Sequence, residues 1–290
     1  MRPVQSTTKT IVVGVDGSTT SADALAWSVG LSERLGFDVT AISAWQPRRH
    51  RMLRSRDQDP PPEEMERKLR EELDKFVADA GAGHVSREVS CGATWDVLCE
   101  AANRPEVPLV VVGTRGLGTV SGLLLGSVSR RLLFGSPRPI ALIPHGDRVP
   151  STVFDHVVIA VDGSSCSAAV TEWGARLCSD LNVGAVVLEC IDAGAEVPPG
   201  WLDEVVHDAT AVLEDRWCGP FRDWGVPYET VVRNADPRAC IVATAEEQNA
   251  GMIVVAARGA GQFDGLGGTA SYLARHSPVP LAVVPPECPD

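Results

Sequence analysis

Short apolar runs and longer amphipathic segments alternate along the whole chain. In the first half, runs rich in valine and isoleucine predict strands over residues 10–15, 38–44, 85–89, 108–112 and 139–143. Segments with apolar residues at helical spacing predict helices over residues 20–35, 62–80, 94–103 and 127–134. Because the apolar residues of each run are consecutive, the strands are expected to be buried on both faces, as in a parallel sheet covered by helices.

The second half repeats the pattern of the first. IVVGVDGS at 11–18 matches VVIAVDGS at 157–164, and RPIALIP at 138–144 matches VPLAVVP at 279–285. In the second half, strands are predicted over residues 156–161, 184–190, 228–232, 252–256 and 280–284, with a helix between the breaks at 198–200 and 218–220. The repeat predicts two homologous α/β domains, 8–146 and 154–287. Each is expected to be Rossmann-like, with a five-stranded, mainly parallel sheet sandwiched by helices.

A glycine-rich segment, GTRGLGTVSGLLLGS at 113–127, connects a predicted strand to a predicted helix. Two residues separate Gly113 from Gly116, nine separate Gly116 from Gly126, and Ser127 follows. Glycines let the backbone approach a ligand closely, and the free amides of a helix start favour an anion. The carboxyl ends of parallel strands are also where such sheets bind ligands. The segment therefore predicts a phosphate site, to which Arg115 would add guanidinium donors.

Two further features of this region have alternative interpretations. Asp16 ends the first predicted strand, where its carboxylate could cap the following helix or accept hydrogen bonds from a base or ribose. Its repetition as Asp162 fits both roles. The hydroxyls of Ser127 and Ser129 could likewise cap a helix or contact a ligand.

Several other classes of protein are disfavoured. The chain has no GxxxxGK[ST] motif, no GxGxxG after the first strand and no set of kinase motifs. A net charge of −12 opposes a general nucleic-acid role. No apolar run is long enough to span a membrane, and the start lacks a signal-like segment, so a cytoplasmic location is expected. The eight cysteines form no CxxC pair and are expected to be reduced thiols, with no zinc site. The arginine-rich stretch Arg48–Arg56 is either a solvated loop or a cationic flap.

The chain has the VDGS opening, the tryptophan of the first helix, the last strand ending in proline and the G-x2-G-x9-G-[ST] spacing. In these four features it resembles the universal stress protein family. The resemblance covers both halves and indicates a tandem member of the type common in actinobacteria. The glycine spacing is that of the family's ATP-binding subgroup. The resemblance implies ATP with Mg²⁺ as ligand. It also implies a homodimer or a pairing of domains through the last strand, 138–144, within one chain or between chains.

The same resemblance assigns roles to residues of the first domain. Asp16, between Val15 and Gly17, would contact the base or ribose, and the region of Ala44 would line the adenine pocket. The ribose and phosphates would be cradled by Gly113, Arg115 and Gly116. The triphosphate would be held by the start of the helix at Gly126, Ser127, Val128 and Ser129.

The second domain departs from this pattern. Ala256 replaces the first glycine, and only eight residues separate Gly259 from Gly268. The usable residues there are Asp162, Gly163, Arg258, Gly259, Gly268, Thr269 and Ser271. We therefore expect domain 2 to bind ATP more weakly than domain 1, or not at all.

Three classes of function are considered; the residues indicate only the phosphate site, and the resemblance implies the stress-response context of the first class. The first is a regulatory stress-response protein that binds ATP and senses or signals adenylate status, without catalytic residues. The second is a weak ATPase or phosphotransferase, although no histidine, glutamate or lysine beside the glycine loop is an evident base. The third is an interaction module that binds no nucleotide.

Overall fold

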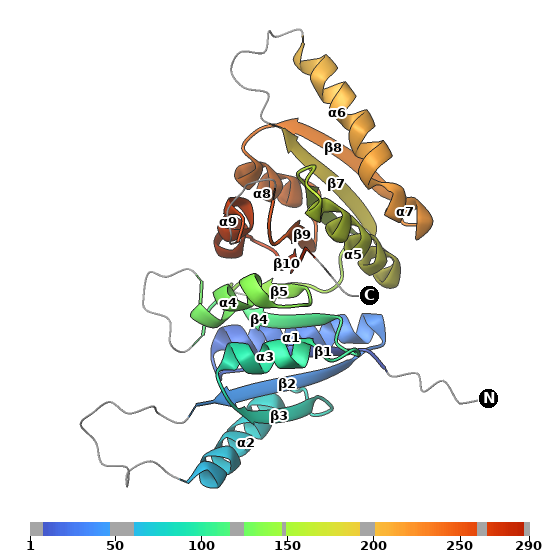
Figure 1. The fold of residues 1–290 in the computed structure, drawn as a ribbon. Coiled ribbons are helices and arrows are strands. Elements are labelled where there is room, and N and C mark those ends of the chain that lie inside the picture. Colours follow the sequence, from blue (N-terminus) through green and yellow to red (C-terminus); the bar gives the residue numbers. More distant parts are fainter. Residues whose placement is uncertain are drawn as a thin grey trace, which may run out of the picture.

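Strands and helices alternate through both halves of the computed structural model (Figure 1). It describes residues 8–46, 61–116, 125–146, 149–191, 201–259 and 266–286. The arginine-rich stretch Arg48–Arg56 and residues 117–124 of the glycine loop lie outside the described residues.

The elements of each half follow in the same order. Domain 1 contains β1 (Thr10–Gly14), α1 (Thr19–Leu35), β2 (Asp38–Trp45), α2 (Pro62–Asp79), β3 (Ser86–Cys91), α3 (Thr94–Ala102), β4 (Leu109–Gly113), α4 (Ser127–Gly135) and β5 (Ile140–Ile143). Domain 2 contains β6 (His156–Val161), α5 (Cys166–Leu181), β7 (Gly184–Ile191), α6 (Leu202–Trp217), α7 (Gly219–Asp223), β8 (Tyr228–Asn234), α8 (Pro237–Glu247), β9 (Met252–Ala256), α9 (Gly268–His276) and β10 (Leu281–Val284). Where bounds were predicted, for the elements of domain 1 and the strands of domain 2, they differ from these by at most two residues. The short helix α7 was not predicted; it begins where Pro220, near its start, presets the backbone.

The ten strands form one sheet in the order β3-β2-β1-β4-β5-β10-β9-β6-β7-β8. Neighbouring strands within each domain are parallel, which confirms the predicted fold class. At the seam between the domains, β5 and β10 pair antiparallel, with Ala141 opposite Ala282. The last strand of each domain therefore pairs within the chain. Pairing with a second chain stays a prediction.

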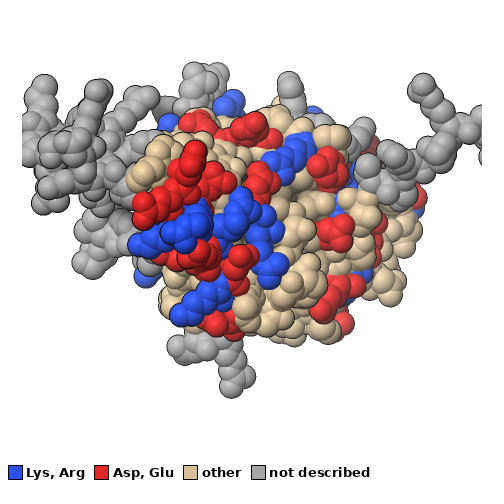
Figure 2. All heavy atoms as spheres, turned by 90° about the horizontal axis from the view of Figure 1, so that it is seen from below, with Lys and Arg blue, Asp and Glu red and all other residues tan. Residues whose placement is uncertain are grey.

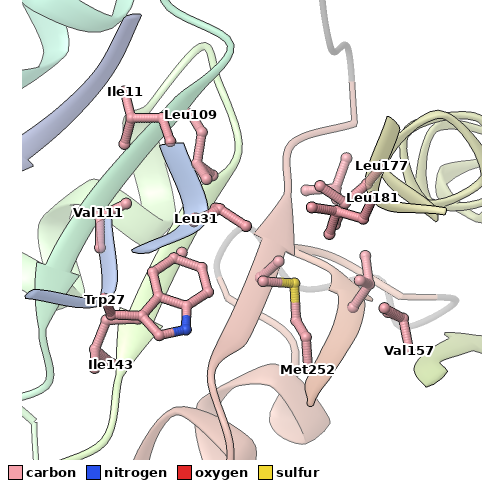
Figure 3. Close-up of a cluster of buried hydrophobic side chains, with 14 of the residues drawn as sticks. Ile11, Trp27, Leu31, Leu109, Val111, Ile143, Val157, Leu177, Leu181 and Met252 are labelled. Carbon is pink, nitrogen blue, oxygen red and sulfur yellow. The ribbon is translucent and has the colours of Figure 1, made fainter. Parts of the chain in front are cut away.

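Helices cover both faces of the sheet. One face packs against α1, α2, α5, α6 and α7, and the other against α3, α4, α8 and α9. On the first face the core runs across the seam: Trp27 and Leu31 of α1 and Leu177 and Leu181 of α5 belong to one cluster (Figure 3). Arg34 of α1 also donates a hydrogen bond to the carbonyl oxygen of Leu181 at 2.8 Å. The two domains thus share one apolar layer.

The surface of α2 is charged but not of one sign. Arg67 pairs with Glu71 and Arg70 with Glu66, four residues apart along the helix. Figure 2 shows basic and acidic side chains interleaved on this side of the molecule. A mixed surface of this kind lacks the continuous basic strip that follows a nucleic-acid backbone.

Two expectations about the chain's environment can be compared with the structure. In the described parts of the chain, no helix has the length and apolar character needed to cross a membrane. Cys178, Cys218 and Cys240 are buried free thiols, as expected, whereas Cys91 is exposed. Burial raises the pKa of the Cys178 thiol to about 12, so this thiol is an inert part of the core.

Candidate functional site

A cavity of about 320 Å³ opens where β1 and β4 end side by side. The chain runs from β1 toward β2 and β3 on one side and from β4 to β5 on the other, so this is the switch point of the domain 1 sheet. The cavity is lined by Gly14, Val15, Asp16, Ser21, Thr94, Leu98, Val112, Gly113, Arg115, Gly116, Leu125, Gly126, Ser127, Val128 and Ser129.

Most of the residues predicted for domain 1 meet at this cavity, but two do not line it. Gly17 forms the turn after Asp16, with a φ of 82° that favours glycine. Ala44 is partly buried at the end of β2 and packs against the core cluster. The cavity also contains residues that the sequence did not indicate, such as Thr94 and Leu98 of α3. An apolar residue on a helix carries no sequence signal that distinguishes a cavity wall from a core.

Asp16 shapes the turn between β1 and α1. Its Oδ1 accepts hydrogen bonds from the backbone amide of Ser18 at 3.1 Å and from the Ser18 hydroxyl at 2.6 Å. Ser18, not Asp16, caps α1, because its Oγ accepts the backbone amide of Ser21 at 3.2 Å. The other carboxylate oxygen of Asp16 lies against Gly116, where an added Cβ would overlap with it. Asp16 therefore presents a carboxylate at the cavity wall while it holds the capping residue.

The three glycines of the motif have three different roles. A Cβ at Gly113 would lie 2.8–2.9 Å from backbone and side-chain atoms of Thr20, so this glycine lets α1 begin close to β4. Gly116 makes room for the Asp16 carboxylate. Gly126 is the N-cap of α4, and its amide donates to the carbonyl oxygen of Thr114 at 2.8 Å. A Cβ at Gly126 would meet its neighbours only at 3.6 Å or more, so the protein itself does not require a glycine there.

The start of α4 forms one wall of the cavity. It has no side-chain cap, and Ser127 and Val128 stand in its first turn at the cavity. Uncapped amides and the helix dipole together favour an anion at this position. Ser129 is buried and donates its hydroxyl to the carbonyl oxygen of Gly113 at 2.8 Å, so this hydroxyl joins α4 to β4. Arg115 is exposed at the rim.

Domain 2 has a corresponding cavity of about 450 Å³, larger than that of domain 1. Of its predicted residues, Asp162, Arg258, Gly259, Gly268 and Thr269 line it, whereas Gly163 and Ser271 do not. Asp162 repeats the arrangement of Asp16: its Oδ1 accepts the amide of Ser164 at 3.1 Å, and its other oxygen lies against Gly259.

Hydrogen bonds correct the expected match between the two glycine loops. Gly267 is the N-cap of α9, and its amide donates to Ala257 at 2.9 Å just as that of Gly126 donates to Thr114. The alignment of Gly268 with Gly126 is therefore wrong by one residue. In domain 2, seven residues separate Gly259 from the N-cap glycine Gly267, whereas in domain 1 nine residues separate Gly116 from Gly126. Because Gly267 and Gly268 are adjacent, the sequence alone did not indicate which of them is the N-cap of the helix.

The corrected match changes the chemistry of the second cavity. Gly268 takes the place of Ser127, and Ala270 takes the place of Ser129, so both hydroxyls of the α4 start are missing from α9. Cys190 of β7 lines the cavity at the position equivalent to Ala44. Burial and contact with Cys240 raise the pKa of the Cys190 thiol, so it stays uncharged. The second cavity has the larger volume, and its helix start presents the hydroxyl of Thr269 where α4 has those of Ser127 and Ser129.

The fold and the two cavities define a tandem α/β protein with one candidate ligand site at the switch point of each domain. The universal stress protein family matches residues 7–144 and 154–285, and the chain belongs to this family. The predicted resemblance is thereby confirmed for both halves.

Relatives that match over nearly their whole length support this assignment. The chain is 29% identical to a universal stress protein of Mycolicibacterium smegmatis, over 98% of this chain and 99% of that protein. It is 30% identical to a universal stress protein of Mycobacterium tuberculosis, over 94% and 95% of the two chains. The fold is similar to the crystal structure of a universal stress protein from Archaeoglobus fulgidus, with a TM-score of 0.71, 22% identity and coverage of 97% and 99%.

Proposed function

We propose that this chain is a regulatory protein that binds ATP in domain 1 and senses or signals adenylate status through the occupancy of that site. The observation that carries the proposal is the cavity wall at the start of α4. There the N-cap is a glycine at which a Cβ would meet protein atoms only at ordinary contact distances, no side chain caps the helix, and Ser127 is exposed at the cavity. This wall has the features of a phosphate site.

The rest of the cavity suits a nucleoside. Its volume of about 320 Å³ is within the range of small-ligand sites. Val15, Leu98 and Val112 provide apolar surface, and the Asp16 carboxylate stands at the end of β1 as an acceptor for a base or ribose. A ligand lying from β1 toward α4 would have its base at the apolar end and its phosphates at the helix start.

A divalent cation would come with the phosphates. Among the described residues, no three His, Cys, Asp or Glu side chains are grouped to hold a metal ion. Mg²⁺ commonly keeps waters and is bound through one or two carboxylates together with phosphate oxygens. Because Asp16 is assigned to the base or ribose, phosphate oxygens and waters would be the ligands of Mg²⁺ at this cavity. In this arrangement Mg²⁺ would neutralise phosphate charge that Arg115 also faces.

The described lining of this cavity favours binding over turnover. Hydrolysis needs a positioned base and a stabiliser of transition-state charge. Arg115 could stabilise charge, but the acidic side chain among the described lining residues is Asp16, whose Oδ1 is engaged by Ser18. Domain 2 has no hydroxyl at the positions of Ser127 and Ser129, presents that of Thr269 instead and has the larger cavity, and it is proposed to bind ATP more weakly.

A matched pair of substitutions tests the proposal. Gly126→Ala places a methyl group where the phosphates would approach, and the neighbouring protein atoms leave room for it. We expect ATP affinity, measured by titration calorimetry with Mg²⁺, to fall about tenfold or more. Gly267→Ala makes the same change in domain 2, where the added Cβ would also have its nearest protein neighbour at 3.6 Å, and is expected to leave the affinity unchanged.

The outcomes distinguish the three classes of function. ATP should raise the melting temperature of the unmodified chain, because a ligand of the folded state stabilises it by mass action. A chain with no bound nucleotide after purification and no thermal shift with ATP would be an interaction module, and the proposal would be wrong. ADP that accumulates with time would indicate turnover. Equal losses from both alanine variants would contradict the assignment of the site to domain 1.

A further inference from the structure

A second, smaller cavity adjoins the domain 1 site at the seam between the domains. It has a volume of about 150 Å³ and lies where β5 ends and the antiparallel β10 begins. We call it the seam groove. Its polar and charged lining comes from both domains and consists of Thr114, Arg115, His145, Arg275, His276 and Ser277. Arg115 lines both the seam groove and the domain 1 cavity, so the two adjoin at this residue.

The seam groove is rich in cationic side chains, although the chain as a whole has a net charge of −12. Arg115 and Arg275 are charged at all ordinary pH values, and two imidazoles stand beside them. The carboxylate in contact with this group is Asp23, whose Oδ2 lies 3.2 Å from Nδ1 of His145. Among the described residues, the ion pair at this group of two arginines and two histidines is the one between Asp23 and His145.

The two basic side chains from domain 2 are held in place. Arg275 donates from Nε to the carbonyl oxygen of Ser271 at 2.8 Å, which fixes its side chain along the last turn of α9. His276 stacks on Tyr272 with ring centroids 4.2 Å apart. Side chains that are already ordered lose less entropy when they bind a ligand.

The internal repeat allows each residue of the seam groove to be compared with its counterpart in the other domain. Helices α4 and α9 are both nine residues long and both end at a serine C-cap, so Arg275 matches Phe134 and His276 matches Gly135. After the last strands, His145 matches Pro286 by the same offset. The mirrored position beside the domain 2 site is therefore apolar, and Phe134 is 49% exposed there. Arg115 is matched by Arg258 in domain 2, whereas Arg275, His276 and His145 have no basic counterparts at the mirrored positions.

We propose that the seam groove binds the end of the phosphate chain of the nucleotide in domain 1, so that domain 2 supplies Arg275 and His276 to the site of domain 1. The proposal rests on the proposed function. The domain 1 cavity lies at the ends of β1 and β4. The next strand of the sheet is β5, which ends at the seam groove. A nucleotide that lies along this edge with its base near β1 directs its phosphates toward the groove.

The test compares nucleotides with short and long phosphate chains. Affinities of AMP and ATP are measured by calorimetry for the full chain and for the Arg275→Ala/His276→Ala double variant. We expect the double variant to lower ATP affinity about tenfold, because charge-assisted contacts to phosphate are lost, while AMP affinity changes less than about twofold. Arg275→Lys keeps the charge and should retain more ATP affinity than Arg275→Ala. Phe134→Ala, at the mirrored position, is the matched control and should change neither affinity.

Each other outcome has a definite meaning. Unchanged ATP affinity in the double variant overturns the seam-groove proposal and leaves the proposed function intact. Equal losses for AMP and ATP also overturn it, because the residues would then act on the whole site. If the unmodified chain binds no nucleotide but binds inorganic tripolyphosphate, and the double variant loses that binding, the groove is an anion site and the proposed function is wrong. If it binds neither probe, both proposals are wrong.

Discussion

Ser129 donates a hydrogen bond from its Oγ to the carbonyl oxygen of Gly113 at 2.8 Å. This bond joins the first turn of α4 to the end of β4 and so sets the position of the helix start relative to the cavity. Domain 2 has Ala270 at the equivalent position and cannot form the bond. The difference shows how the two repeats keep one fold while their cavities diverge.

Ser129→Ala should therefore affect both stability and binding. The Gly113 carbonyl oxygen loses its buried partner, and we expect the free energy of unfolding to fall by about 1 kcal/mol. ATP affinity should fall as well, because the amides of α4 are held less firmly. Chemical denaturation and calorimetry measure the two effects. Ala270→Ser in domain 2 is the control and should leave ATP affinity unchanged; a loss of stability without any loss of affinity would contradict the link between the helix position and binding.

Gly113→Ala tests whether the first glycine of the motif serves packing. The added Cβ would lie 2.8 Å from the carbonyl oxygen of Thr20, so the start of α1 must move. We expect a destabilisation of about 1–3 kcal/mol, the usual cost of overpacking. The control is Ala256→Gly, the reverse change in domain 2, which is expected to cost about 0.5–1 kcal/mol through backbone entropy alone. A Gly113→Ala variant of unchanged stability and reduced ATP affinity would instead assign this glycine to ligand contact.

Gly116→Glu should abolish ATP binding while the fold remains. Its Cβ would overlap with the Asp16 carboxylate, and its own carboxylate would add a like charge beside the phosphates. Nucleotide released from the denatured protein measures binding, and circular dichroism checks the fold. Gly259→Glu makes the equivalent change against Asp162 in domain 2 and should leave ATP bound. ATP retained by the Gly116→Glu variant would move the site away from this loop.

The stability of domain 1 should depend on pH through Glu88 and Arg104. Both carboxylate oxygens of Glu88 accept hydrogen bonds from Arg104 at 2.8 Å. These bonds lower the pKa of Glu88 from its ordinary value of 4.5, against the opposing effect of burial. A pKa that is lower in the folded state stabilises the protein above the unfolded value, and this contribution is lost as the pH falls through the folded value.

The matching experiment compares the chain with its Glu88→Gln variant. Because the pair is partly exposed to solvent, we expect it to contribute no more than about 0.5–1 kcal/mol at neutral pH. The difference in unfolding free energy should shrink as the pH falls below 4.5. A difference that is constant over this range would mean that the glutamine changes packing and not charge.

The secondary structure was predictable because each element has its own local signal. The run Leu109–Val112 is apolar at consecutive positions, and the structure buries all of β4. The glycine loop also has a local signal, since strand, glycines and helix follow one another in the sequence. The same signal failed at Gly267 and Gly268, where two adjacent glycines could each be the N-cap and only a hydrogen bond to Ala257 distinguishes them.

The sequence by itself determined the repeat, the order of strands and helices, and the glycine loop that follows β4, because hydrophobic periodicity and backbone freedom are properties of neighbouring residues. Only the tertiary structure decided that β5 pairs with β10 within the chain, that Gly116 stands against Asp16, and that α9 brings Arg275 to a cavity that Arg115 also lines. These relationships join residues far apart in the chain. They depend on how sheet edges and helices pack in space, which no local pattern encodes.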